Sequence, residues 1–126
     1  MRRRTSALVG ITLALTTIGF AAPAQARTAA CTKLSNGVLC TWLANRVGDS
    51  AEVTDSYEKT GGSPITARFG HYNRGGTWWD NGAFNQPAKT TYYFTWPRAD
   101  YSDCSAVVGF LDTAGKRYEV PPVSVC

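Results

Sequence analysis

The segment AEVTDSYEKT, residues 51–60, carries the pattern that decides the fold class. Its apolar residues Ala51, Val53 and Tyr57 recur at a period of two, which matches the alternation of side chains across an extended strand. The intervening positions are polar: Glu52, Thr54, Ser56 and Glu58. We therefore predict a β-strand that buries one face and exposes the other.

The neighbouring segments also read as strands. Apolar and polar residues alternate in ITARFGHY, residues 65–72, and TTYYFTW, residues 90–96, is rich in residues that favour strands. VLCTWLANRV, residues 38–47, and SAVVGFLD, residues 105–112, are apolar on both alternations, which predicts strands buried on both faces. We expect the following aromatic side chains in the core: Trp42, Tyr92, Phe94, Trp96 and Phe110.

Turns rich in Gly, Pro, Asn and Ser separate these segments, and no stretch shows a convincing helical period. Short strands with frequent turns are typical of all-β proteins. The sequence therefore predicts a small antiparallel β-sandwich or barrel of about seven to eight strands.

The first 26 residues predict a secretory signal peptide. Three arginines at positions 2–4 precede an uncharged apolar segment, residues 7–20, and Ala24-Gln25-Ala26 is a small-x-small cleavage site. The apolar segment is too short for a membrane span, and no second one follows. We expect cleavage after Ala26 and a single secreted β domain of residues 27–126. The composition resembles that of exported proteins of high-GC Gram-positive bacteria.

The charge balance argues against nucleic acid as a partner. Loss of the three leader arginines lowers the formal net charge from +4 to +1, and the remaining charges are scattered. Nucleic-acid binding depends on a concentrated basic surface that neutralises phosphates. We therefore expect no nucleic-acid partner.

The four cysteines predict two disulfides, because an exported chain of this size is commonly stapled in this way. Three pairings are possible in principle. In CTKLSNGVLC, residues 31–40, a four-residue loop Leu34-Ser35-Asn36-Gly37 with Gly37 left-handed would place Cys31 opposite Cys40. A second hairpin that turns at Thr113-Ala114-Gly115 would bring Cys104 near Cys126. We favour Cys31–Cys40 and Cys104–Cys126.

The chemistry-bearing residues predict no enzyme, metal site or cofactor. His71 is the only histidine, and we interpret it as a strand-end residue bonded to backbone or water. There is no Cys-x-x-Cys spacing for a metal and no Gly-x-Ser-x-Gly around a nucleophile. A small secreted hydrolase remains an alternative, in which His71 would work with a carboxylate, Glu52 or Glu58, and with Arg68 as a phosphate-binding residue.

The aromatic residues give the strongest functional signal. NRGGTWWDNGAF, residues 73–84, holds two adjacent tryptophans, and in an extended chain Trp78 and Trp79 must point to opposite faces. Exposed Trp and Tyr are frequent in binding surfaces. The candidate binding residues are Tyr72, Arg74, Trp78, Trp79, Asp80, Asn81 and Tyr93.

These observations favour a secreted, non-catalytic protein-binding module. An enzyme inhibitor or a subunit of an exported complex, including one of toxin type, would fit, with another secreted or cell-surface protein as the partner. A carbohydrate-binding module is the alternative, since Trp78 and Trp79 could stack on a glycan while Asn73, Asp80 and Asn81 bond its hydroxyls.

Overall fold

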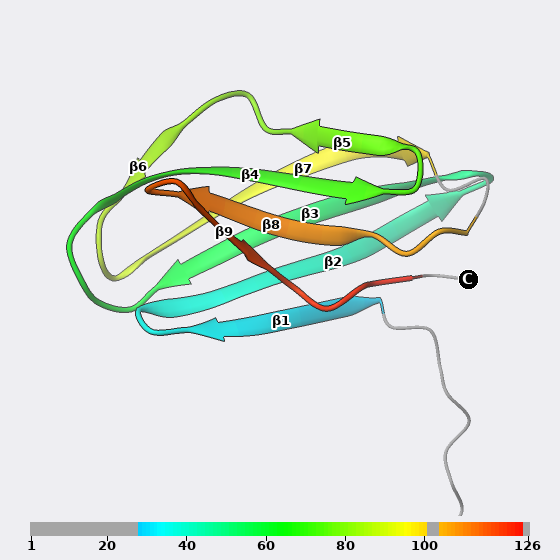
Figure 1. The fold of residues 1–126 in the computed structure, drawn as a ribbon. Helices are drawn as coiled ribbons and strands as arrows, with labels where there is room; N and C mark the ends of the chain where they lie inside the picture. Colours follow the sequence, from blue (N-terminus) through cyan, green and yellow to red (C-terminus); the bar gives the residue numbers. More distant parts are fainter. Residues whose placement is uncertain (1–27, 101–103, 125–126) are drawn as a thin grey trace, which may run out of the picture.

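The computed structural model describes residues 28–100 and 104–124. In this part of the chain every regular element is a β-strand, and the strands form two antiparallel sheets that pack face to face (Figure 1). The prediction of an all-β antiparallel sandwich or barrel is therefore confirmed, and the fold is the sandwich; the described residues form nine strands, rather than the expected seven to eight.

Sheet A has four strands in the order β1-β2-β3-β7. The chain enters through two hairpins, and the long β7 returns to pair with β3. The strand bounds are β1 Ala29–Leu34, β2 Gly37–Val47, β3 Ser50–Lys59 and β7 Thr90–Asp100.

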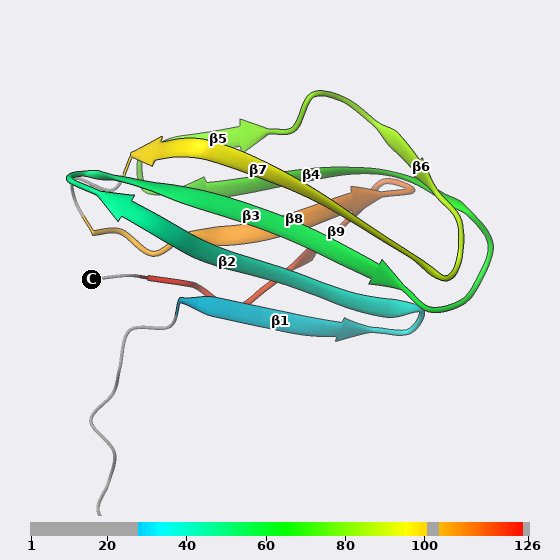
Figure 2. The ribbon, with the colours of Figure 1, turned by 180° about the vertical axis from the view of Figure 1, so that it is seen from behind.

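Sheet B has the order β5-β4-β8-β9, and the short β6 pairs with the first part of β4 (Figure 2). Both hairpins of this sheet, β4–β5 and β8–β9, have two-residue turns. The strand bounds are β4 Ile65–Asn73, β5 Gly76–Trp79, β6 Phe84–Gln86, β8 Val108–Thr113 and β9 Lys116–Glu119.

The core lies between the two sheets and follows the alternation of the strands. Ala51, Val53 and Tyr57 are buried on the inner face of β3, as the period of two predicts. Phe69 of β4 and Leu111 of β8 face them from sheet B and are 1% exposed. Burial of these apolar side chains is the main favourable contribution to the fold.

A polar side chain lies inside this core, at an inward position of β3. Asp55 shares the inward alternation of β3 and is fully buried. Thr41 Oγ1 of β2 donates to its Oδ1 across 2.5 Å, and burial raises the pKa of Asp55 to about 8. Gly109 of β8 makes room for this pair, because a β-carbon at position 109 would overlap Oγ1 of Thr41.

The two open sides of the sandwich are closed by hydrogen bonds between edge strands. Trp96 Nε1 of β7 donates to the Trp79 carbonyl of β5 across 3.1 Å. At the opposite side, Thr32 Oγ1 of β1 donates to the Glu119 carbonyl of β9 across 2.8 Å. Each sheet is therefore fixed relative to the other at both edges.

The first hairpin confirms the favoured disulfide and corrects its turn. Cys31 lies opposite Cys40 and is bonded to it. The loop has two residues rather than four, because Leu34 and Gly37 already pair as strand residues. Gly37 does not have a positive φ; a side chain is excluded there because its β-carbon would overlap the Glu58 carbonyl of β3.

The second hairpin turns at Ala114 and Gly115, whose φ angles are 51° and 73°. Two central residues with positive φ match the twist of the flanking strands, so the turn suits a tight hairpin. Thr113, predicted in the turn, instead pairs with Lys116. Cys126 lies outside the described residues, so the Cys104–Cys126 pairing stays a prediction.

The prediction that residues 38–47 are buried on both faces is wrong. The outer face of β2 is only partly covered, and Trp42, expected in the core, is 36% exposed there. A central strand has a neighbouring strand on each side within its sheet. In a two-layer sandwich, however, the second sheet covers only one of its two faces. The apolar outer positions of β2 therefore belong to the surface.

Candidate functional site

The strand register collects aromatic and arginine side chains on the outer surface of sheet B. Trp79 of β5, Gly70 of β4 and Phe110 of β8 lie side by side in one row across the sheet. Arg68 of β4 and Arg117 of β9 lie in the next row on the same surface. Both pair with Asp112 of β8, which lies between them. We call this surface the Trp79 face and define it by Arg68, Tyr72, Trp79, Phe110 and Arg117.

A glycine lets the two large rings of the Trp79 face meet. Trp79 and Phe110 flank Gly70, and their ring centroids are 5.1 Å apart with an interplanar angle of 80°. A β-carbon at position 70 would overlap the Phe110 ring. Phe110 is consequently fully buried on the outer surface of a sheet, whereas Trp79 is 40% exposed. Edge-to-face packing of this kind stabilises both ring positions.

Two guanidinium groups lie over the exposed tryptophan. Arg68 Cζ is 4.9 Å and Arg117 Cζ is 5.4 Å from the centre of the Trp79 ring. Arg117 Cζ also lies 3.8 Å from the centre of the Phe110 ring. Attraction between a cation and an aromatic face favours these positions.

Carboxylates hold both guanidinium groups in place. Arg68 Nε donates to Asp80 Oδ1 across 2.9 Å, and its Nη2 donates to the Asp80 carbonyl across 2.8 Å. Arg117 forms a bidentate pair with Asp112 across 2.8 Å and 3.1 Å, which raises the pKa of Arg117. The side chains are thus ordered before any partner arrives, which lowers the entropic cost of binding.

Tyr72 extends the Trp79 face along β4. Its hydroxyl donates to Glu119 Oε2 across 3.1 Å, and its ring lies 6.3 Å from that of Phe110. Burial, followed by the bond to Glu119, raises the pKa of Tyr72. A neutral phenol therefore sits at this end of the face at neutral pH.

A shallow hollow of about 350 Å³ opens beside Trp79. Such a volume is near the lower end of the range for small-molecule pockets and would also accept one large side chain. It is lined by Trp79 and Arg68 together with residues of β4, β8 and the neighbouring turns: Thr66, Ala67, Ala83, Asp112, Thr113, Ala114 and Gly115.

The two adjacent tryptophans point to opposite faces, as strand alternation requires. Trp79 lies outward, whereas Trp78 is half-buried and stacks on His71 with ring centroids 5.2 Å apart. Asp80 turns inward again and is 8% exposed. Its Oδ2 accepts the Phe69 amide across 2.8 Å, so this carboxylate anchors the loop after β5 and the Arg68 side chain.

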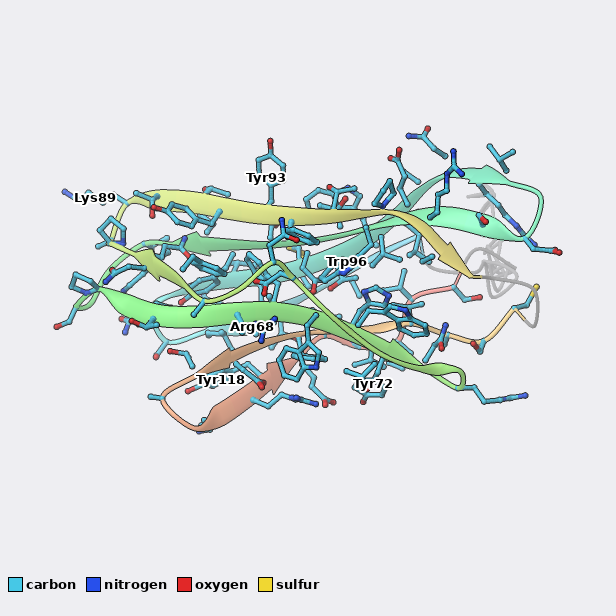
Figure 3. The ribbon with its side chains drawn as sticks, turned by 90° about the horizontal axis from the view of Figure 1, so that it is seen from above. Arg68, Tyr72, Lys89, Tyr93, Trp96 and Tyr118 are labelled. Carbon is cyan, nitrogen blue, oxygen red and sulfur yellow. A yellow bond between two sulfur atoms is a disulfide. The ribbon has the colours of Figure 1, made fainter. Side chains whose placement is uncertain are left out.

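The other candidate residues do not join the Trp79 face. Tyr93 is 71% exposed, but it projects from the outer surface of sheet A, on the opposite side of the sandwich from Tyr72 (Figure 3). Arg74 is exposed at the β4–β5 turn, and Asn81 is exposed in the loop after β5. The structure therefore brings Tyr72 and Trp79 together and separates both from Tyr93.

His71 is enclosed by aromatic rings rather than placed at a surface. It is 1% exposed, and the Trp96 ring meets it edge-on with centroids 4.5 Å apart. Neither ring nitrogen has a hydrogen-bond partner among the described residues, so of the two expected partners, backbone and water, the backbone one is wrong. Burial lowers the pKa of His71 to about 4, so the ring is neutral at neutral pH.

The residues considered for acid–base chemistry are not brought together. Glu52 and Glu58 belong to the outer alternation of β3 in sheet A, whereas Arg68 lies on sheet B and His71 faces the core. Residues 28–100 and 104–124 contain no group of three His, Cys, Asp or Glu side chains suited to a metal ion. No helix in the same part is long and apolar enough to cross a membrane.

Sequence reasoning missed Arg68, Phe110 and Arg117 as parts of the candidate site. Phe110 was expected in the core, and it is buried, but against the outer surface of sheet B. Arg68 and Arg117 lie on the polar alternations of their strands, which is a detectable signal. That they meet one tryptophan depends on the order of the strands in sheet B, which local periodicity does not give.

Comparisons of this chain with protein-family models, curated proteins and solved structures found no match.

Proposed function

We propose that this protein is a secreted, non-catalytic binding module that docks a partner protein on the Trp79 face. The observation that carries the proposal is the exposed Trp79 ring with two guanidinium groups lying over it, each fixed by its own carboxylate. Tryptophan, tyrosine and arginine are the residues most enriched among energetic hot spots of protein interfaces.

The form of the Trp79 face supports a protein partner. The hollow beside Trp79 would receive an apolar side chain, and the rings around it supply contact area that is already ordered. Each guanidinium directs two of its five N–H donors to the acceptors described above, and the remaining donors suit a partner's carbonyl or carboxylate oxygens.

The partner that we propose is another secreted or cell-surface protein. The signal peptide predicted over residues 1–26 supports export, and the Cys31–Cys40 disulfide suits an oxidising compartment. An enzyme inhibitor or a subunit of an exported complex, including a toxin complex, would use such a face. Mass spectrometry of the protein from culture medium should find Arg27 at its N-terminus; retention of residues 1–26 would contradict export by this route.

A capture experiment with two matched tryptophan variants tests the docking proposal. The mature protein is immobilised and exposed to the medium of the producing organism. Trp79→Ala should lose a stoichiometric partner that the wild-type protein retains. Trp42→Ala is the control, because Trp42 is 36% exposed on the other sheet and should leave capture unchanged. Equal capture by wild type and Trp79→Ala would overturn the proposal.

The geometry around His71 does not favour the hydrolase alternative. A general base needs hydrogen-bond reach to the proton that it takes, and the Trp78 and Trp96 rings enclose this imidazole. The glycan site expected at Trp78, Trp79 and Asp80 is not favoured either, since Asp80 directs its carboxylate to backbone and Arg68.

A further inference from the structure

A second pair of exposed aromatic side chains lies on the outer surface of sheet A. Trp42 of β2 is 36% exposed and Tyr93 of β7 is 71% exposed. Tyr93 points away from the sandwich on the side opposite Tyr72 (Figure 3). This surface belongs to the other sheet and is separate from the Trp79 face.

The strand register places small polar residues of β3 on the surface between the two rings. Trp42 pairs with Thr54 of β3, and Tyr93 pairs with Ser56 of the same strand. Because β3 lies between β2 and β7, the backbone positions of the two residues are two strands apart, about 9.5 Å across the sheet, and two residues apart along β3, about 7 Å. The hollow between them measures about 350 Å³ and is lined by Trp42, Thr54, Ser56, Thr91, Tyr93 and Thr95.

The lining of this hollow is neutral and rich in hydroxyl groups. Thr54 and Thr95 share a hydrogen bond of 2.8 Å between their Oγ1 atoms, which orders both side chains. Each hydroxyl offers one donor and two acceptor positions; Thr54 is only 6% exposed, so the partly exposed Thr95 is the one of the two that retains capacity for a ligand. Within residues 28–100 and 104–124, no charged side chain lines the hollow, in contrast to the two arginines of the Trp79 face.

The disulfide lies beside this surface. Cys40 occupies the same row as Ser56 and Tyr93, and its bond to Cys31 joins β1 to β2 at that row. The four strands of sheet A therefore present a covalently reinforced platform. A platform of this kind positions side chains more reproducibly than a loop does.

We propose that this surface of sheet A binds a neutral polysaccharide chain, with Trp42 and Tyr93 stacked on two separate sugar rings of the same chain. The C–H faces of a sugar pack on aromatic rings, and its hydroxyls match the donors and acceptors of Ser56, Thr95 and their neighbours. The neutral lining selects against charged ligands, which would leave solvent without gaining an ionic partner. The proposal is independent of docking on the Trp79 face.

A depletion assay on insoluble cellulose, chitin and starch tests the proposal with the full mature protein. At least one of the three polymers should remove wild-type protein from solution. The double variant Trp42→Ala/Tyr93→Ala should bind that polymer about tenfold or more weakly, because both stacking contacts are lost. Raising NaCl to about 0.5 M should leave binding unchanged, since a neutral ligand is not screened.

Two further variants make the result specific. Tyr93→Ala alone removes the more exposed ring, should preserve the near-ultraviolet circular dichroism of the fold, and should weaken binding by itself. Trp79→Ala should bind the polymer like wild type, which separates this proposal from docking on sheet B. Absence of wild-type binding to all three polymers, or equal binding by the double variant, would overturn the proposal.

Discussion

Arg68 Nε donates to Asp80 Oδ1 across 2.9 Å, and the exposures of the two side chains are 39% and 4%. This half-buried pair fixes the guanidinium over the Trp79 ring and anchors the loop that follows β5. It links the stability of the fold to the geometry of the proposed docking surface.

Replacing Asp80 should cost much more stability than replacing its surface counterpart. Asp80→Asn removes a buried charge that accepts bonds from Arg68, Phe69 and Gly82. We expect a loss of about 2–4 kcal/mol in the free energy of unfolding, measured in urea. Asp112→Asn breaks a pair whose side chains are 33–38% exposed and should cost about 1 kcal/mol or less. Similar losses in both variants would contradict the anchoring role of Asp80.

Gly70→Ala should disturb the Trp79 face from within. The new methyl group would overlap the Phe110 ring, which has no exposed surface into which it could shift without displacing Arg117 or Trp79. Overpacking of this kind costs about 1–3 kcal/mol. Urea denaturation measures the loss, and tryptophan fluorescence should report a changed Trp79 environment. An unchanged unfolding midpoint would show that the position of the Phe110 ring does not require a glycine at position 70.

Asp55 and His71 should impose opposite pH dependences on stability. Burial raises the pKa of Asp55 from 3.8 to about 8, so its stabilising contribution is present at low pH and is lost as pH rises toward 8. Burial lowers the pKa of His71 from 6.5 to about 4, so its contribution is present above pH 6.5 and is lost as pH falls. Between about pH 4 and 6.5 the two groups change the free energy of unfolding in opposite directions. Above that range, of these two groups only Asp55 still changes it with pH.

The free energy of unfolding should therefore fall between about pH 6.5 and 8, by up to roughly 1.4 kcal/mol per pH unit. Asp55→Asn cannot release this proton and should flatten that slope. His71→Gln should instead steepen the fall in stability as pH rises from about 4 to 6.5, because the opposing contribution is gone. Retention of the alkaline slope in Asp55→Asn would refute the assignment to Asp55.

Peptide mapping without reduction should recover two disulfide-linked peptides. One joins Cys31 to Cys40, as the structure shows, and the other is predicted to join Cys104 to Cys126. The chain-entropy description gives about 2.7 kcal/mol for closing the ten-residue loop, so Cys31→Ala/Cys40→Ala should lower the melting temperature. Recovery of a peptide linking Cys31 to Cys126 would exclude both pairings.

Strand alternation predicted much of the fold because each segment's pattern depends on its own residues. A period of two accounts for the inward positions of Val53 and Phe69. It also accounts for the opposite directions of Trp78 and Trp79. The same alternation places Asp55 inward, in line with Val53. Its burial was not predicted, because a charged residue is normally expected at the surface.

The candidate site could not be predicted in the same way, because it depends on which strands are neighbours. Trp79 meets Arg117 only because β8 and β9 follow β4 in sheet B, and Tyr93 lies on the other sheet because β7 pairs with β3. Trp42 was misplaced because an apolar surface position and a core position look alike in sequence.

The most direct measurement is the affinity of the captured partner for the wild-type protein and for Trp79→Ala, determined by calorimetric titration. Loss of a central interface tryptophan typically costs about 2 kcal/mol or more, so we predict a dissociation constant raised about thirtyfold or more. Trp42→Ala, with a tryptophan of comparable exposure on the other sheet, should bind like wild type. An unchanged dissociation constant in Trp79→Ala would contradict docking on the Trp79 face.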